Sequence, residues 1–379
     1  MRTDILRRQQ DAMAEHGLDA MISCSPENFA YAAGFIVPSH PVLRHRHAMA
    51  IVPAVGAPAL FGVDMEASTI AARVPDVATT IWKEFSDDPM IVLADQLAGL
   101  GLGSARLGIE TDYLPAADME KLAAALPKAR FAACGHILSR LRQIKTAEEI
   151  KLLGRLSRIA DRAIAGAIEA VGPGSSELDI AAHVTRSVYA QGAEQFKLLI
   201  VATGERSQLP NTGPTDRAIE PGDVCRVEIF PVLAGYHAGV CRTAVVERAP
   251  PRAEEIWQVL VDAKYQLMEM VKPGASCLEI YSAFIARFEE KGLPPISFVG
   301  HGIGLHLHED PYLGSTPMIG RPGDDARLEE GMVLGFEPLC YRTGYGFGMQ
   351  NKDMLLVTAS GSELLSDHTD TDRLLVTGG

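Results

Sequence analysis

The sequence is poor in basic side chains, and it lacks both a long apolar run and a closely spaced pair of cysteines. Its 35 Lys and Arg residues stand against 48 Asp and Glu residues, which gives the 379-residue chain a formal net charge of −13. Nonspecific nucleic-acid binding needs a basic surface, so we expect no nucleic-acid partner. No segment approaches the roughly 18 apolar residues of a membrane span, and we expect no membrane partner either.

The amino-terminal segment and the cysteines both favour a reducing cytoplasm. Residues 1–21 are typical of a charged helix followed by a strand, and they lack the apolar stretch of a signal peptide. The cysteines have no Cys-x-x-Cys spacing, so neither a zinc knuckle nor a disulfide framework is predicted. They are Cys24, Cys134, Cys225, Cys241, Cys277 and Cys340. The glycines of residues 101–108 do not follow the strand–GxGxxG–helix order of a dinucleotide site, and a turn is predicted there.

Residues 1–140 alternate between helical and strand-like patterns. This alternation predicts an N-terminal α/β domain. The predicted helices cover residues 4–16, 86–99 and 115–126, and the predicted strands are Leu18–Ile22, Ala48–Pro53, Ala59–Val63 and Leu107–Ile109.

Residues 141–379 contain an internal repeat. Thr146 and Glu149 have the spacing of a capping box at the start of a long helix. The segment Val171–Ile180 then recurs as Val271–Ile280, and each copy continues into strand-like sequence. The predicted strands are Val224–Val232, Gly235–Val246, Ser297–His308, Met332–Pro338 and Met354–Thr358. We therefore predict an α+β domain of two halves related by a pseudo-twofold axis, with a site between the halves.

The segment GHGIGLHLHEDP, residues 300–311, is the strongest candidate for chemistry. It holds three histidines and two carboxylates, and its glycines allow a close approach of the backbone to a ligand. If the segment is extended, His306 and His308 share one face and His301 lies apart from them. A polar loop would account for any single histidine. The three together, ahead of the carboxylate segment GMVLGFEP at 331–338, favour a site.

These motifs resemble the pita-bread family of creatinase, aminopeptidase P, prolidase and methionine aminopeptidase. The similarity extends over nearly the whole chain, through IKTAEEI at 144–150, PGDVCRVEIFPVLAGYHAGVCRT at 221–243, EEGMVLGFEP at 329–338 and KDMLLVT at 352–358. The resemblance implies a pita-bread C-terminal domain over 141–379, preceded by a creatinase-like α/β domain over 1–140.

The resemblance also implies where the peptidase branch holds its two metal ions. Its five ligands correspond to Glu228, Gly239, His301, Glu337 and Lys352 of this sequence. Glycine offers no ligand and a lysine ammonium repels a dication, so we expect a metal-independent protein without a cofactor. A single ion on Glu228, His301 and Glu337 remains an alternative.

Creatinase is the metal-free member that the chain most resembles. The similarity implies that Arg46 binds a substrate carboxylate through its planar fork. The proton-shuttling histidine of creatinase falls at Asn211, an amide that cannot act as a base, and two of its binding residues fall at His237 and Cys241. Creatine is therefore not the expected substrate. His308 or His237 could replace the lost base, and Cys241 could be a nucleophile if its pKa is lowered.

We therefore predict a creatinase-like hydrolase that cleaves an amidine or amide C–N bond in a small, carboxylate-bearing nitrogen compound. His301 and Glu337 would frame the reacting group, His308 or His237 would move protons, and Glu228 and Lys352 would set the local charge. An Xaa-Pro aminopeptidase or dipeptidase with a depleted metal site is the first alternative. A non-catalytic binding protein of the same fold is the second. The resemblance also implies a homodimer.

Overall fold

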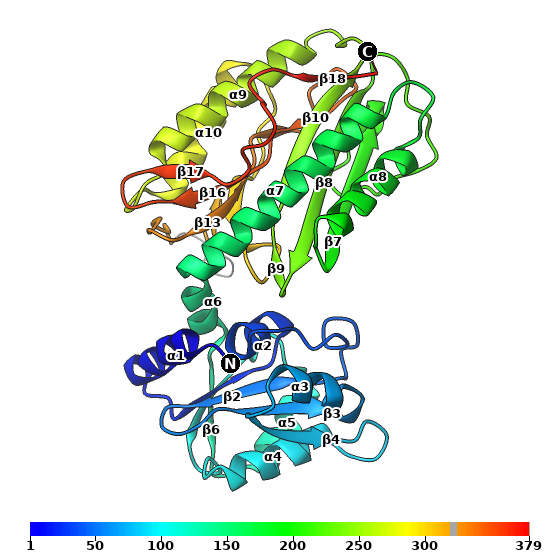
Figure 1. The fold of residues 1–379 in the computed structure, drawn as a ribbon. Coiled ribbons are helices and arrows are strands. Elements are labelled where there is room, and N and C mark those ends of the chain that lie inside the picture. The colour runs from blue at the N-terminus through cyan, green and yellow to red at the C-terminus, as the bar shows by residue number, and fades with distance from the viewer. Residues whose placement is uncertain (319–323, 379) are drawn as a thin grey trace. The chain divides into compact units, whose positions relative to one another are not determined.

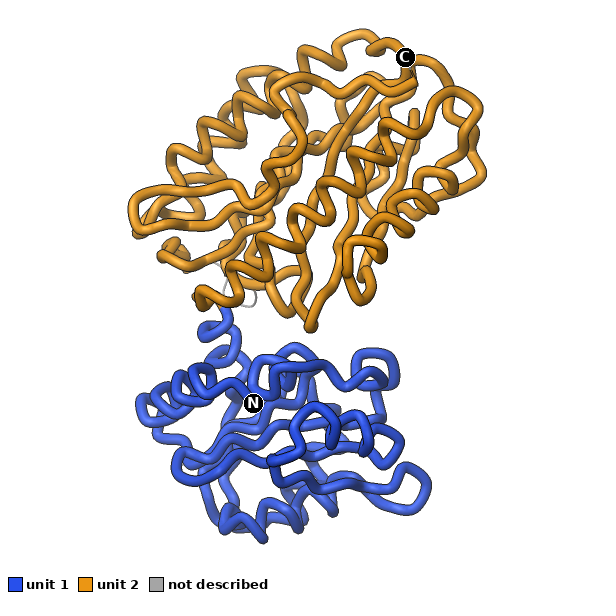
Figure 2. Tube along the Cα trace, in the orientation of Figure 1, with its two compact units in different colours: residues 1–142 blue, residues 143–379 orange. Residues whose placement is uncertain are grey.

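The computed structural model describes residues 1–318 and 324–378. The chain divides into two compact units, unit 1 from Met1 to Arg142 and unit 2 from Gln143 to Gly379 (Figure 2). This division lies two residues after the predicted boundary at 140. Within the described residues, no helix has the length and apolar character needed to cross a membrane.

Unit 1 is built on one mixed sheet of six strands in the order β4-β3-β2-β1-β5-β6. Its strands are β1 (Ala20–Ser23), β2 (Met49–Pro53), β3 (Ala59–Val63), β4 (Ala78–Trp82), β5 (Arg106–Ile109) and β6 (Arg130–Ala133). Its helices are α1 (Thr3–His16), α2 (Pro26–Ala33), α3 (Ala67–Arg73), α4 (Pro89–Gly99), α5 (Ala116–Ala125) and α6 (Gly135–Gln143), with the 3₁₀ turn η1 (Asp64–Glu66). The apolar residues of the sheet pack into two cores that include Met21 and Phe29 in one and Ile22 and Phe61 in the other.

Unit 2 repeats the order helix, turn, helix and strands twice (Figure 1). The first half contains α7 (Ala147–Ala170), α8 (Glu177–Ala190), β7 (Gln195–Thr203), η2 (Gly204–Gln208), β8 (Val224–Leu233), β9 (Tyr236–His237) and β10 (Val240–Val246). The second contains α9 (Ala253–Met270), α10 (Cys277–Glu290), β11 (Phe298–Gly302), β12 (Glu309–Gly314), β13 (Val333–Phe336), β14 (Leu339–Cys340), β15 (Met349–Gln350), β16 (Asp353–Val357), β17 (Ser362–Leu364) and β18 (Leu375–Thr377).

Local sequence explains why the two halves begin alike. Thr146 and Glu149 form the predicted capping box at the start of α7, so that prediction is confirmed. Ser176 caps α8 and Ser276 caps α10, each by accepting a hydrogen bond from the backbone three residues on. The predicted internal repeat is therefore present in the structure.

Each half carries its own sheet. The first is ordered β10-β8-β7, with β9 paired to β8, and β18 from the C-terminal end of the chain joins it beside β10. The second is ordered β12-β11-β13-β16-β17, and β14 and β15 pair separately. Helices α7 and α8 pack on the first sheet and α10 packs on the second (Figure 1). The two sheets meet where Cys241 of β10 pairs with Lys352, the residue before β16. Two backbone hydrogen bonds make this junction, from Cys241 N to Lys352 O at 3.1 Å and from Lys352 N to Cys241 O at 3.3 Å.

Several predicted strands differ in extent: Gly235–Val246 is divided into β9 and β10, and Met332–Pro338 is reduced to β13. The strand predicted over Ser297–His308 ends at Gly302, and the chain turns through residues 303–308 before β12 begins. His306 is exposed, while His308 folds back so that its ring stacks on that of His301 with centroids 3.8 Å apart. The expectation that His306 and His308 share a face away from His301 is therefore wrong, because a turn replaces the alternation of an extended strand.

Candidate active site

The candidate site lies at the junction of the two sheets of unit 2. Glu228 on β8 is opposite Cys241 on β10, and Cys241 in turn pairs with Lys352. On the second sheet, His301 of β11 is opposite Gly335 of β13, two residues before Glu337. This strand register brings the three predicted residues Glu228, His301 and Glu337 around one point although they are far apart in sequence.

The ammonium of Lys352 occupies that point. Its Nζ lies 3.1 Å from Oε1 of Glu228 and 3.2 Å from Oε2 of Glu337. His301 Nε2 lies 3.3 Å from the same Nζ and 3.2 Å from Oε1 of Glu337. Burial alone would lower the pKa of Lys352, but the two carboxylates more than offset this and raise it. The lysine is therefore charged, and the expectation that it faces Glu228 and Glu337 is confirmed by these distances.

The charge of Lys352 has the opposite effect on Glu337 and lowers the pKa of its carboxyl. Burial alone would raise the pKa of the carboxyl, but the Lys352 ammonium more than offsets this and lowers the pKa well below its usual value. Glu337 is 3% exposed and Lys352 is 1% exposed, so this ion pair is shielded from solvent. The site is an enclosed cluster of two carboxylates, one ammonium and one imidazole.

A second layer of polar side chains holds these carboxylates in place. Gln350 donates from Nε2 to Oε2 of Glu337 at 2.7 Å and accepts from Nη1 of Arg226 at 3.1 Å. Arg226 is fully buried, its Nη1 is 3.9 Å from Oε2 of Glu228, and its guanidinium lies over the Tyr341 ring. The sequence reasoning missed Arg226 and Gln350. Both stand two residues before a predicted site residue, and the two-residue period of a strand would have placed them on the same face.

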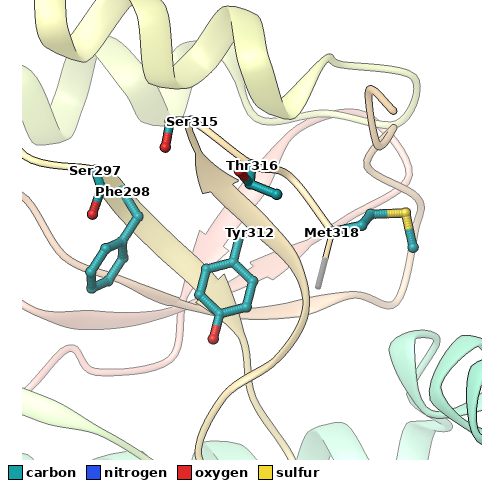
Figure 3. A pocket seen from close by; sticks show the side chains of 6 residues that line it. All are labelled: Ser297, Phe298, Tyr312, Ser315, Thr316 and Met318. Carbon is teal, nitrogen blue, oxygen red and sulfur yellow. The ribbon is translucent and has the colours of Figure 1, made fainter. Parts of the chain in front are cut away.

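His308 links this cluster to Tyr312, which lines a small cavity. Its ring stacks on His301, and its Nδ1 lies 2.9 Å from the hydroxyl of Tyr312. A cavity of about 240 Å³ adjoins Tyr312 and is lined by Ser297, Phe298, Tyr312, Ser315, Thr316 and Met318 (Figure 3). Figure 3 shows the rings of Phe298 and Tyr312 beside each other, with centroids 6.2 Å apart. Burial, followed by the electrostatic influence of the neighbouring His301 and Lys352, lowers the pKa of His308 to about 3.

His237 holds the turn that carries His308. The backbone N–H of His237 donates to the carbonyl of Gly304 at 2.7 Å, and its Nδ1 lies 3.2 Å from the same oxygen. Burial lowers the pKa of His237 to about 4, so its imidazole is neutral at physiological pH. These contacts show a positioning role, and a role in proton transfer remains a prediction.

Two further predicted residues differ in their surroundings. Asn211 is exposed in the turn after η2, close in sequence to Leu209 and Pro210, whose carbonyls accept from Arg226. Cys241 is fully buried, and burial raises the pKa of its thiol well above the usual value. A thiol that stays protonated is a poor nucleophile, so the geometry speaks against the nucleophilic role considered for Cys241.

Arg46 belongs to unit 1, where its guanidinium is paired. Nε and Nη2 donate to the two oxygens of Glu84 at 2.8 and 2.9 Å, and the side chain of His45 lies 2.9 Å from the same carboxylate. This is the two-point geometry that suits Arg and a carboxylate. Binding of a substrate carboxylate by Arg46 remains a prediction, and it requires Glu84 to share or release the guanidinium.

Two sequence models of known families match this chain. That of the creatinase/prolidase N-terminal domain matches residues 6–144, and that of metallopeptidase family M24 matches residues 151–359, more than half of the chain. The chain belongs to metallopeptidase family M24. The M24 proteins are hydrolases, so the expectation of a hydrolase is supported at this level.

Individual relatives agree with the M24 assignment. The Xaa-Pro dipeptidase of Pyrococcus furiosus is 30% identical over 319 residues, which are 83% of this chain and 88% of the relative. The creatinase of a Bacillus species is 24% identical over 367 residues, 94% of this chain and 88% of the relative. The solved prolidase of Pyrococcus horikoshii has a TM-score of 0.82 at 26% identity, covering 97% of this chain and 99% of that one. The predicted fold, a creatinase-like domain followed by a pita-bread domain, is confirmed.

Membership of the M24 family corrects two expectations. We expected metal independence, and this is contradicted because the matching family is one of metallopeptidases, with Xaa-Pro dipeptidases among the relatives. We also expected creatinase to be the nearest in character, but the dipeptidase relative is more similar in sequence. Both expectations relied on Gly239 and Lys352, two positions that do not by themselves decide the class of reaction.

The residues at the site nevertheless do not fit the pair of bridged ions that the M24 family implies. Among the described residues, no group of three or more His, Cys, Asp or Glu side chains is arranged to hold a metal ion. The oxygens of Glu228 and Glu337 are directed at the Lys352 ammonium instead. A bridged pair of dications needs more carboxylate charge than these two side chains supply.

Proposed function

We propose that this M24 member hydrolyses the amide C–N bond of small peptides with a free carboxylate, of the Xaa-Pro dipeptide type. The observation that carries the proposal is the arrangement of His301, His308 and Glu337 at one site in a chain that is 30% identical to an Xaa-Pro dipeptidase. This is the first alternative that the sequence left open. Arg46, as a ligand of the substrate carboxylate, belongs to the same proposal.

The substrate approaches the site through His308 and Tyr312. His301 and Lys352 are almost completely buried, whereas His308 and Tyr312 are partly exposed. Tyr312, whose hydroxyl lies 2.9 Å from Nδ1 of His308, lines the cavity of Figure 3. The walls of this cavity are mainly the apolar surfaces of Phe298, Tyr312 and Met318. A compact apolar group such as a prolyl ring fits a space of about 240 Å³ with these walls.

His308 is the group best placed to move a proton. Its imidazole is neutral at physiological pH because burial and nearby positive charge hold its pKa at about 3. A neutral imidazole can accept a proton from the attacking water and return it to the leaving nitrogen, so that the C–N bond is replaced by C–O and N–H bonds. It is a weak base in the free site, and negative charge developing on the substrate would raise its proton affinity.

Release of proline from Xaa-Pro dipeptides by the purified full chain tests this proposal, with and without added Mn²⁺ or Co²⁺. We expect proline release by the wild-type chain, and a loss of about 10²-fold or more in kcat/KM for His308→Gln, the size of a general acid–base contribution. His368→Gln is the control, since His368 is an exposed histidine of the same unit, and it should stay close to wild type. Absence of proline release under every metal condition would contradict the peptidase proposal.

Hydrolysis of a C–N bond in a small nitrogen compound other than a peptide is the second candidate. The Lys352 ammonium between two carboxylates favours it, because this arrangement differs from the ligand set that the peptidase branch implies. Guanidino acids, cyclic amidines and N-acyl amino acids belong in the same assay, with release of urea, ammonia or free amino acid as the signal. The homodimer also remains a prediction, and light scattering of the purified chain would measure its mass.

A further inference from the structure

The three N–H donors of the Lys352 ammonium are matched by three acceptors. An ammonium has three N–H donors, and three acceptors surround Nζ: Glu228 Oε1 at 3.1 Å, Glu337 Oε2 at 3.2 Å and His301 Nε2 at 3.3 Å. His301 is oriented for this role because its Nδ1 lies 2.8 Å from the carbonyl of Gly302, which accepts its proton and leaves a lone pair on Nε2. Every donor of the ammonium therefore has an acceptor.

Two glycines make room for the lysine side chain. A Cβ at Gly239 would lie 3.2 Å from Cε of Lys352 and 2.4 Å from the Phe230 ring. A Cβ at Gly335 would lie 3.3 Å from the same Cε and 3.0 Å from the His301 ring. Real Cβ atoms essentially never come as close as 2.4 Å, and contacts of 3.0–3.3 Å are tighter than nine in ten real ones, so a larger residue at either position would require its neighbours to shift.

The ring of Phe230 fills the space beside Gly239 and packs against the ammonium of Lys352. Nζ of Lys352 lies 4.6 Å from the centroid of the Phe230 ring, where the ring face attracts a cation. Phe230, Gly239 and Lys352 thus form one consistent set. The side chain of Lys352 is therefore held in the cluster by packing as well as by its ion pairs.

The acceptors of Lys352 are also the side chains that a divalent ion would need. A metal ion binds carboxylate oxygen and imidazole nitrogen at about 2.0–2.6 Å, with the same lone pairs that now accept from Nζ. An ammonium and a dication also repel each other at this separation. We propose that Lys352 is a tethered cation that competes with a divalent metal ion for Glu228, His301 and Glu337, so that an ion binds there only when the lysine is displaced.

Mn²⁺ binding to the full chain tests the proposal, measured by titration calorimetry and by the electron paramagnetic resonance of free Mn²⁺. Lys352→Glu removes the competitor and adds a ligand, so it should bind Mn²⁺ about tenfold or more tightly than wild type. Lys352→Met has a similar length and no charge, and should fall between the two. Adding Glu337→Gln to Lys352→Glu should abolish the gain, which assigns the ion to this cluster.

The readout is metal binding, so it holds whether or not the chain is a peptidase. If a variant is poorly folded without metal, the shift of its melting temperature on adding Mn²⁺ measures the same affinity, since a ligand stabilises the folded state by mass action. The proposal would be overturned if wild type and Lys352→Glu bound Mn²⁺ equally tightly. It would also be overturned if Mn²⁺ stabilised Lys352→Glu no more than it stabilises wild type.

Discussion

Arg242 is a fully buried cation that joins the helical and sheet layers beside the candidate site. Its Nε donates to Asp161 of α7 at 2.9 Å, and its Nη2 donates to Asp353 of β16 at 2.8 Å. Its Nη1 also donates to the carbonyl of Lys352 at 2.8 Å. Asp353 further pairs with Lys264 of α9 at 2.6 Å. Arg242 therefore connects elements of both halves of unit 2.

Arg242→Met should lower the free energy of unfolding of unit 2 by about 3–5 kcal/mol, because removing one partner leaves buried carboxylates without their countercharge. Urea unfolding followed by circular dichroism measures the change. Lys291→Met is the control, since Lys291 pairs with Glu290 at the surface, and its stability should stay close to wild type. Equal stability of both variants would show that the buried pairs contribute nothing net.

The buried His40 should make the stability of unit 1 decrease in acid. It is 2% exposed between the rings of Phe29 and Tyr113, and burial, followed by His47, lowers its pKa from 6.5 to about 4. Between these values only the unfolded chain takes up a proton. Stability is therefore complete above about pH 6.5 and decreases as the pH falls toward 4.

Lowering the pH from about 7.5 to about 5 should cost unit 1 about 2 kcal/mol through His40 alone. Urea unfolding of wild type and His40→Phe at both pH values measures this, and the variant should lose less stability than wild type. His16→Gln, an exposed histidine of the same unit, should retain the wild-type pH dependence. The same acid sensitivity in His40→Phe would assign the effect to other groups.

At the scale of single residues, motif order predicted that Glu228, His301, Glu337 and Lys352 belong to one site, and the structure places them together. Their roles in catalysis or binding remain predictions. Phe230 and Arg226 were not predicted, because their roles depend on what faces them across the sheets. The expectation of metal independence was wrong, because two changed ligand positions were taken to decide the reaction of this chain.

Among the elements, the loop from 204 to 217 depends on one carboxylate of α8. Glu177 is fully buried and accepts hydrogen bonds from the backbone and hydroxyl groups of Thr203 and Thr215, all at 2.8–3.0 Å. Nε of Arg206 donates to both of its oxygens at 3.2 Å. The two ends of the loop, which carries Asn211, are thereby tied to the first turn of the helix.

Glu177→Ala should loosen this loop. Hydrogen bonds to a charged group contribute about 1.5–3 kcal/mol each, so amide exchange in residues 204–217 should become roughly tenfold faster or more. Hydrogen–deuterium exchange with mass spectrometry measures it. The equivalent residue of the second half, Cys277, gives the control Cys277→Ala, which should leave residues 204–217 at the wild-type rate. Unchanged exchange in Glu177→Ala would contradict this account.

The turn at residues 303–308 shows where element prediction failed. The alternation of GHGIGLHLH was compatible with one extended strand, yet the chain leaves the sheet after Gly302. His237 fixes the turn through the Gly304 carbonyl, and Glu309 fixes it by accepting from the backbone N–H of His306 at 3.2 Å. Lys145 pairs with Glu309 at 3.2 Å. These partners come from distant segments, so a local pattern could not reveal them, whereas the local capping signal at Thr146 and Glu149 predicted the start of α7 correctly.

At the scale of the whole molecule, the apolar residues follow the division into two units. Two of the cores, which include Phe29 and Phe61, draw all their residues from unit 1. A third, which includes Trp257 and Phe336, draws all its residues from unit 2. Each unit thus has a core of its own and the size of a typical domain. The sequence indicated these two domains because the α/β alternation of residues 1–140 and the repeat of residues 141–379 can each be seen in local sequence patterns.

Each unit, expressed alone, should therefore fold. We expect the chain 1–142 and the chain 143–379 each to give a cooperative thermal transition and slow amide exchange in their core strands, because burial of apolar surface within one core is what drives folding. Met21→Asp in the separate unit 1 should abolish its transition, since it places an unpaired charge in that core. The same substitution in the full chain should leave a transition from unit 2. Loss of all cooperative unfolding in the full-length Met21→Asp protein would show that the units fold only together.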